Sequence, residues 1–211
     1  MPMIVMLSLA ASQPDADPQA FRTRRWHVSG YTLVVTEARL PTVPFEIVTA
    51  RLPFRPSYAA SVAASKVVVP RFAIALPGLT LRGNSLEIEG QLLQHFGRED
   101  STEVAAAAVL RSGQIGLAGP VSANLAWGNG LSYALTQPRY EIGRGGVRGV
   151  DTVQLQYHMS FETEITSARN PRVHYVARLH HRSGIYGVIS PSRTGSNYIG
   201  VGLRFDLGSR R

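Results

Sequence analysis

A strict alternation of apolar and polar residues is the feature that most constrains how this chain folds. It is clearest between residues 153 and 165. There, Val153, Leu155, Tyr157, Met159, Phe161 and Ile165 alternate with Gln154, Gln156, His158, Ser160, Glu162 and Glu164. A period of two residues places neighbouring side chains on opposite faces of a β-strand. The segment therefore predicts a strand with one apolar and one polar face.

The same pattern recurs along most of the chain, separated by loops rich in glycine and proline. The predicted strands are Trp26–Glu37, Ser57–Arg71, Ser85–Phe96, Thr102–Arg111, Val121–Tyr133, Val153–Ile165, Arg172–His181 and Asn197–Leu207. Most have about 9–12 residues, which suits a tilted membrane-spanning strand better than the roughly 5–6 residues usual in soluble sheets. An even number of strands places both chain ends on one side of the barrel. No capped helix is predicted.

Composition indicates which face of these strands meets the solvent. Hydrophobic residues make up 44% of the chain and charged residues 17%, whereas about 25% charged residues is usual in soluble domains. No apolar run approaches the roughly 18–20 residues of a transmembrane helix. We therefore expect an all-β fold, an eight-stranded antiparallel up-and-down transmembrane β-barrel with apolar residues toward lipid and a polar lumen. A soluble barrel that binds an apolar ligand is the alternative.

The expected domain organisation is simple. Residues 3–11 form a short apolar core followed by small residues, similar to the end of a secretory signal. We therefore assign residues 1–20 to a signal remnant or disordered tail and residues 21–208 to one β-barrel domain. The expected location is the bacterial outer membrane.

Charge and cysteine content restrict the partners. The net charge is +8, Lys66 is the only lysine, and cysteine is absent. Arginine binds phosphate and carboxylate groups with two hydrogen bonds, so an anionic partner is expected. Because the arginines are scattered, a membrane lipid fits better than nucleic acid. Without cysteine there is no disulfide, thiolate metal site or cysteine nucleophile, and no cofactor is predicted.

Three polar residues fall on the apolar face of the last two strands. The apolar parity of strand 172–181 continues through His181 to Ser183, and that of strand 197–207 begins at Asn197. With both chain ends periplasmic, these residues meet near the outer surface of the membrane, at the lipid boundary. A polar cluster on a lipid-facing surface requires an explanation.

Such a cluster matches the requirements of ester hydrolysis. A serine hydroxyl becomes a nucleophile when an imidazole accepts its proton, and a third group orients the imidazole. We therefore assign Ser183 as nucleophile, His181 as general base and Asn197 as the orienting residue. Backbone amides of residues 184–187, including Gly184, are candidates for an oxyanion hole. Arg182 and Arg193 are candidates to hold lipid phosphates.

At these residues the chain resembles the outer-membrane lipid A 3-O-deacylase family. That family carries a His-x-Ser pair on the penultimate strand, matched by His181 and Ser183, and a glutamate at the start of the last strand, where this chain has Asn197. Residues 87–97, 128–135 and 180–187 also resemble related bacterial barrel proteins of no known activity. The resemblance covers roughly residues 85–205. It implies lipid A as partner and hydrolysis of an acyl ester of lipopolysaccharide.

Other interpretations remain open on the sequence alone. The chain is either such a hydrolase or a non-catalytic outer-membrane barrel with a structural or lipid-binding role, in which Asn197 marks lost activity. Glu162 and Glu164 share a polar face, where lumenal pairing with Arg178 or Arg204 is favoured over catalysis. His180 and His181 point to opposite faces, which argues against a shared metal ion. The sequence leaves homodimer formation open.

Overall fold

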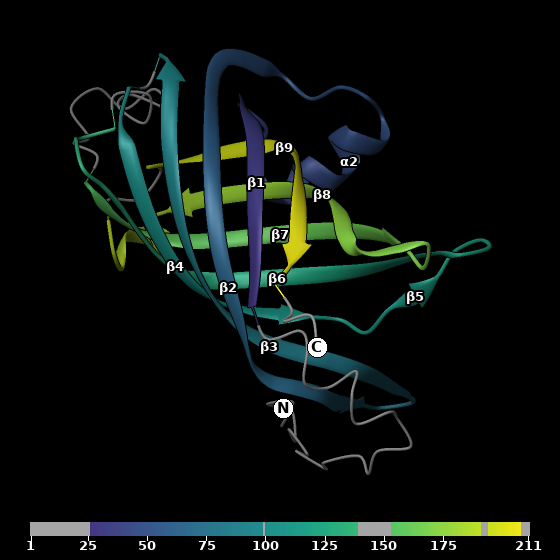
Figure 1. Cartoon of the computed structure of the whole chain (residues 1–211). Coiled ribbons are helices and arrows are strands. Elements are labelled where there is room, and N and C mark those ends of the chain that lie inside the picture. Colours follow the sequence, from purple (N-terminus) through teal and green to yellow (C-terminus); the bar gives the residue numbers. More distant parts are fainter. Residues whose placement is uncertain (1–25, 99, 139–152, 191–193, 208–211) are drawn as a thin grey trace.

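A closed ring of antiparallel strands forms the molecule in a computed structural model, which describes residues 26–98, 100–138, 153–190 and 194–207 (Figure 1). Its strands are β1 (Trp26–Thr36), β2 (Phe54–Leu76), β3 (Leu79–Gly97), β4 (Thr102–Arg111), β5 (Ile115–Gly116), β6 (Val121–Ala134), β7 (Leu155–Ser167), β8 (Asn170–Ser183) and β9 (Gly195–Asp206). Each long strand pairs with its sequence neighbours. The ring closes because β1 pairs with β9 and β4 pairs with β6. The predicted eight-stranded barrel is confirmed.

The strand predictions differ from the structure in three places. β2 and β3 extend toward each other until only Pro77 and Gly78 separate them, whereas the sequence predicted a loop. The two-residue strand β5 was not predicted. A short helix, α2 (Val43–Val48), follows a 3-10 turn over Leu40–Thr42 in the β1–β2 connection, where no helix was expected. Proline in its first turn suits a helix start, where the lost N–H has no intrahelical acceptor.

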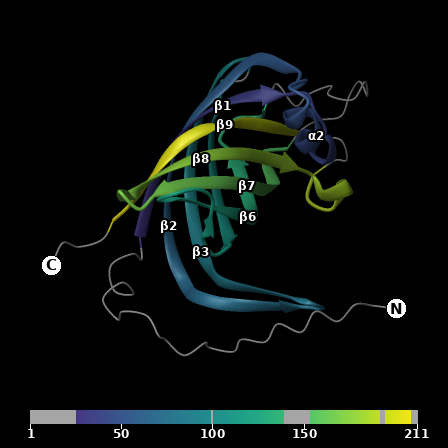
Figure 2. The ribbon, with the colours of Figure 1, turned by 90° about the vertical axis from the view of Figure 1, so that its right-hand side faces the viewer.

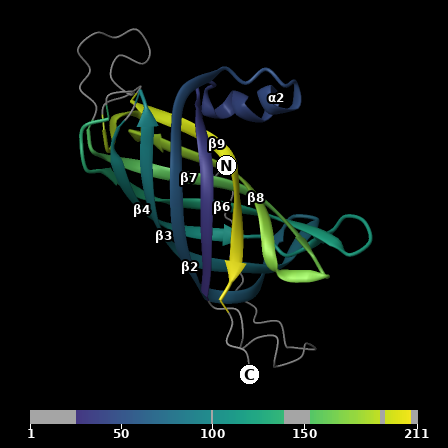
Figure 3. The same cartoon turned by 45° about the horizontal axis from the view of Figure 1, so that its top comes forward.

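The barrel has two unlike ends. β1 begins and β9 ends at one of them, together with the short β7–β8 and β2–β3 turns; we call this the turn end. At the other, the loop end, β1, β6 and β8 end and β2, β7 and β9 begin, with longer stretches of sequence between them. Figure 3, in which the top of the molecule comes forward, shows α2 at the loop end. Short turns on the side of the chain ends and longer loops opposite are typical of outer-membrane barrels.

Polar and charged side chains fill the barrel lumen. The charged lumenal residues include Glu87, Glu89, Glu103, Arg111, Glu162, Glu164, Arg178 and Arg204, all of them buried. Arg178 binds Glu89 and Glu162, each at 2.7 Å. Because every carboxylate here faces a guanidinium or an imidazole, the lumen is a paired network rather than an open channel.

The expected pairing of Glu162 and Glu164 with lumenal arginines is confirmed. Arg178 contacts Glu162 and Arg204 lies 3.6 Å from Glu164. Arg111, which the sequence analysis did not single out, contacts both glutamates, at 2.8 and 3.0 Å. Since these carboxylates are neutralised inside a filled lumen, they are structural.

The outer surface of the wall is apolar. Val201 is 64% exposed and Leu125 54% exposed, whereas the lumenal glutamates are buried. A soluble barrel would enclose its apolar face, so this arrangement excludes the soluble alternative and confirms the lipid-facing orientation of the apolar parity. No helix among the described residues is long and apolar enough to cross a membrane.

Candidate functional site

The structure brings His181 and Asn197 into direct contact. They are register partners on β8 and β9, and His181 Nδ1 lies 2.5 Å from Asn197 Oδ1. His181 is half-buried on the lipid-facing side of the wall, while Asn197 is buried. Antiparallel pairing therefore connects residues sixteen positions apart in sequence.

The hydrogen bonds around Asn197 fix the proton on His181. Asn197 Nδ2 donates to the backbone carbonyl of Ala38, at 2.7 Å. A carbonyl can only accept, so the amide nitrogen must face Ala38 and the amide oxygen must face His181. His181 Nδ1 is then the donor, and in the neutral ring Nε2 keeps its lone pair. This is the tautomer that a general base requires.

Ser183 lies two residues further along β8 with the same parity as His181. It is half-buried and is paired in register with Tyr157 on β7 and Gly195 on β9. Two strand residues span about 7 Å between Cα atoms. Among the hydrogen bonds of the described residues there is none between Ser183 and His181, and loose contacts of this kind are common in active sites without substrate.

The backbone directly after Ser183 is strained. Ile185 and Tyr186 have positive φ values of 46° and 53°, followed by Gly187 at 98°. A β-branched residue in the left-handed region is costly and persists only where the surroundings enforce it. The Gly187 amide donates to the Gly184 carbonyl at 3.2 Å, so it is already used and is not a candidate oxyanion donor. Of the predicted oxyanion segment, only residues 184–186 stay candidates.

Of the two arginines predicted to bind phosphate, only Arg182 is among the described residues. Arg182 lies in the lumen, where Nε donates to Ser132 Oγ at 2.9 Å and approaches Glu103. Its parity is opposite to that of Ser183, so it faces away from the lipid. We therefore remove Arg182 from the site as a correction to the sequence analysis. Arg193 lies outside the described residues, and Gly184 is buried at the end of β8.

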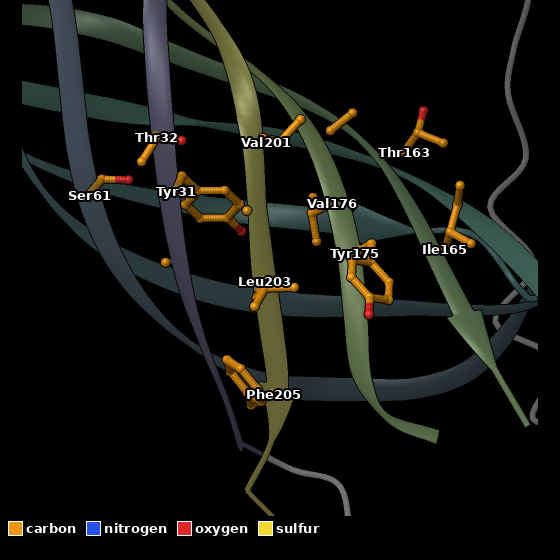
Figure 4. A pocket seen from close by; sticks show the side chains of 13 residues that line it. Tyr31, Thr32, Ser61, Thr163, Ile165, Tyr175, Val176, Val201, Leu203 and Phe205 are labelled. Atoms are coloured by element: carbon orange, nitrogen blue, oxygen red, sulfur yellow. The ribbon is translucent and has the colours of Figure 1, made fainter. Parts of the chain in front are cut away.

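A shallow apolar groove runs along the lipid-facing surface below this trio. Its volume is about 790 Å³, and Figure 4 shows Val201, Leu203 and Phe205 following one another along β9 through its middle. Small residues such as Ala177 line the groove together with larger ones such as Tyr175 and Phe205. Ala177 pairs with Val201 in the same β8–β9 ladder that pairs His181 with Asn197. Ala177 lies about 13 Å from His181, because the two residues are four positions apart on the same strand.

A second histidine cluster lies on the opposite face of the same strands. Glu103 accepts from His95 and His180, each at 3.0 Å, and the His158 and His180 rings are 4.4 Å apart. His180 thus faces the lumen and His181 the lipid, as parity predicts. The described residues contain no group of three or more His, Cys, Asp or Glu that could hold a metal ion.

Sequence reasoning missed Ala38 because a backbone carbonyl leaves no sequence pattern. Ala38 belongs to the segment that follows β1, and its amide is held by Thr36 Oγ1 at 3.2 Å. Thr36 is also the β1 register partner of Asn197. The closing strand pair therefore supports the site from behind.

Comparison with known proteins yields similar solved structures only. The chain matches no protein-family model and no curated protein. Its fold is similar to that of the outer membrane enzyme PagL, with a TM-score of 0.56 and 9% identity over 85% of this chain and 99% of PagL. Neisserial surface protein A (NspA) aligns at a TM-score of 0.43 and 11% identity, over 86% of this chain and 94% of NspA. The likeness to PagL establishes the shared fold.

Proposed function

We propose that this protein is an outer-membrane hydrolase that cleaves an acyl ester of lipopolysaccharide, with Ser183, His181 and Asn197 as its reaction group. The observation that carries the proposal is the chain of hydrogen bonds from Ala38 through Asn197 to His181. It holds the imidazole in the tautomer that accepts a proton, two residues from a serine, on a surface that meets lipid. The fold shared with an outer membrane enzyme supports the location.

The proposed reaction follows the serine-hydrolase pattern. Ser183 Oγ attacks the ester carbonyl carbon while His181 Nε2 takes the hydroxyl proton. The tetrahedral intermediate collapses, and the leaving alkoxide receives that proton from His181 as the acyl chain stays on Ser183. A water molecule then attacks the acyl-serine, gives its proton to His181, and releases the fatty acid while the proton returns to Ser183.

Asn197 sets the rate that this reaction can reach. An amide orients the imidazole as well as a carboxylate does, but its dipole stabilises the imidazolium less than a full negative charge would. The barrier is therefore higher than with the glutamate of the resembling family. We expect a slow hydrolase rather than an inert one, because the tautomer is still correct.

The substrate class follows from where the site lies. The carbonyl of a bound ester must approach Ser183 from the lipid side, with its sugar toward the loop end and its acyl chain along the wall. The groove of Ala177, Val201 and Leu203 offers an apolar surface in that direction. A soluble ester would find no enclosed binding site there. Lipid A, whose acyl esters lie at this depth in the outer leaflet, fits best.

The test compares lipid A from cells that express the protein, the Ser183→Ala variant, or neither. Mass spectrometry should show loss of one acyl chain only with the unaltered protein. The matched control is Ser132→Ala, which removes a lumenal serine at the same height and should leave the acyl loss in place. Identical lipid A in all cells would contradict the proposal.

A non-catalytic, lipid-binding barrel is the second candidate. The specific observation in its favour is Asn197 at the position of a glutamate, with no hydrogen bond from Ser183 to His181 in the described part of the chain. It predicts intact lipid A that co-purifies with both the unaltered protein and the Ser183→Ala variant. Incubating purified protein with lipopolysaccharide in detergent and measuring free fatty acid would separate the two.

A further inference from the structure

The β2–β3 hairpin projects far beyond the barrel wall at the turn end. Pairing between β1 and β2 stops at Trp26 and Lys66, and pairing between β3 and β4 stops at Ser85 and Arg111. From Val67 on β2 to Asn84 on β3, the two strands pair only with each other. We call residues 67–84 the projecting hairpin. Figure 1 shows it leaving the wall on the side where β1 begins and β9 ends.

Local irregularities bend this hairpin away from the line of the barrel strands. Its pairing has three register shifts, between Val67 and Ile74. Arg71 adopts a positive φ of 46°. Bulges increase twist and redirect a strand, and Figure 2 shows β2 and β3 curving until they run across the lower part of the molecule. A straight hairpin would point into the periplasm, whereas a bent hairpin can lie along the membrane surface.

Exposed apolar side chains cover the hairpin. Leu79 is 54% exposed, Val68 46% and Leu81 40%. This apolar surface continues the lipid-facing wall, where Ile88 on β3 is 49% exposed. It also adjoins the segment between β4 and β5, because a Cβ at Gly113 would meet the backbone of Arg82. An apolar ribbon of this size is unfavourable in water and marks an interaction surface.

The charge of the hairpin is uniformly positive. Residues 67–84 contain Arg71 and Arg82 and no acidic residue. Other exposed basic residues near the turn end are Lys66, Arg169 and Arg172. Among the described residues, the exposed acids Glu37 and Asp100 both lie at the loop end. A positive, apolar surface complements a membrane with anionic head groups.

From these observations we infer that the projecting hairpin lies in the head-group region of the inner leaflet, with its leucines among acyl chains and Arg71 and Arg82 on anionic phospholipids. The partner is a phospholipid surface, reached as a continuation of the barrel's lipid contact. Strand addition by another protein is disfavoured because Pro70 removes a backbone donor and the arginines charge the edges. The inference does not depend on catalysis at Ser183.

The absence of cysteine makes a direct test simple. A single Leu79→Cys variant, labelled with an environment-sensitive fluorophore, is reconstituted into vesicles of phosphatidylethanolamine and phosphatidylglycerol that carry a nitroxide lipid. Both leaflets have one composition, so protein orientation does not matter. The lipid-facing wall position Leu92→Cys is the positive reference and Arg51→Cys, at the loop end, the negative one. Heat-modifiable gel migration checks that each variant is folded.

Quenching at position 79 should approach that at position 92 and exceed that at position 51 severalfold. Replacing Arg71 and Arg82 by glutamine should reduce it in these vesicles and change little in phosphatidylcholine vesicles, whereas glutamine at Arg51 and Arg55 should have no effect. Quenching at position 79 no greater than at position 51 would overturn the inference and favour a protein partner. Equal quenching in all vesicles, unchanged by the arginine variants, would overturn the role of anionic lipid.

Discussion

β8 carries two polar sets on its opposite faces, and they have different surroundings. On the lumenal face, Arg178 and His180 are buried and bind carboxylates of β3, β4 and β7. On the lipid face, His181 binds the neutral amide of Asn197, and no hydrogen bond joins Ser183 to a carboxylate of the described residues. The lumenal set satisfies its own charges and serves stability. The outer set places the proposed nucleophile and the proposed base on the lipid-facing surface.

The largest effect should come from removing the nucleophile on the outer face. Ser183→Ala should reduce acyl release from lipopolysaccharide by on the order of 10⁴-fold, about 5.5 kcal/mol in activation free energy, because no other group forms the acyl intermediate. Its urea unfolding curve should not change, since Ser183 stabilises nothing in the lumen. Ser132→Ala is the opposite-face control: it should cost stability and keep activity.

The second-largest effect is expected on the lumenal face of β8. Arg178→Met should lower the free energy of unfolding by about 3–5 kcal/mol, because Glu89 and Glu162 would keep buried charges without this partner. Urea unfolding in lipid vesicles measures this free energy for each variant. Arg55→Met, which breaks an exposed pair with Glu37 at 2.7 Å, should cost about 1 kcal/mol or less. Equal costs would mean that the lumen is more hydrated than the structure indicates.

Asn197→Ala tests the orienting residue. Loss of the amide frees the His181 ring to rotate, so we expect kcat to fall about 10²-fold, or about 2.7 kcal/mol, with KM little changed. Asn197→Asp restores an acceptor for His181 but turns a second oxygen toward the Ala38 carbonyl, so it should recover only part of the rate. If the alanine variant kept full activity, Asn197 would have only a structural role.

The smallest effect is expected from a substitution at the close contact between β1 and β9. A Cβ at Gly200 would collide with the carbonyl oxygen of Thr32 on β1, whereas one at Gly90 meets nothing within 4 Å. Gly200→Ala should cost about 1–3 kcal/mol of unfolding free energy, as overpacking does, and should slow hydrolysis through the β1–β9 contact behind Asn197. Gly90→Ala should be neutral in both assays.

Much of this arrangement was predictable from alternation. Parity placed His181, Ser183 and Asn197 on one face and His180 on the other, and it assigned Glu162 and Glu164 to the lumen. It failed where the period breaks: the bulged residues 67–74 were assigned partly to a loop, although β2 continues through them. Arg182 was predicted to hold lipid phosphate because it lies near the last loop, whereas its parity is lumenal and the structure places it in the lumen.

Contacts between distant strands could not be predicted in this way. Glu103 lies on β4, and only ring closure brings it to both His95 and His180. Arg111 joins carboxylates of β3 and β7 across the lumen. Such contacts depend on the curvature of the barrel, which a two-residue period does not contain.

The sequence by itself determined the strands, their two faces and the shared face of the proposed reaction group, because side-chain direction in a strand depends only on position along it. The tertiary structure alone decided which atoms meet. Closure of β9 on β1 placed the Ala38 carbonyl against Asn197. That single acceptor fixes the orientation of the Asn197 amide, and the amide oxygen in turn fixes the proton on Nδ1 of His181. The physical reason is that parity is a local property of the chain, whereas a hydrogen bond across a closing seam requires the whole ring.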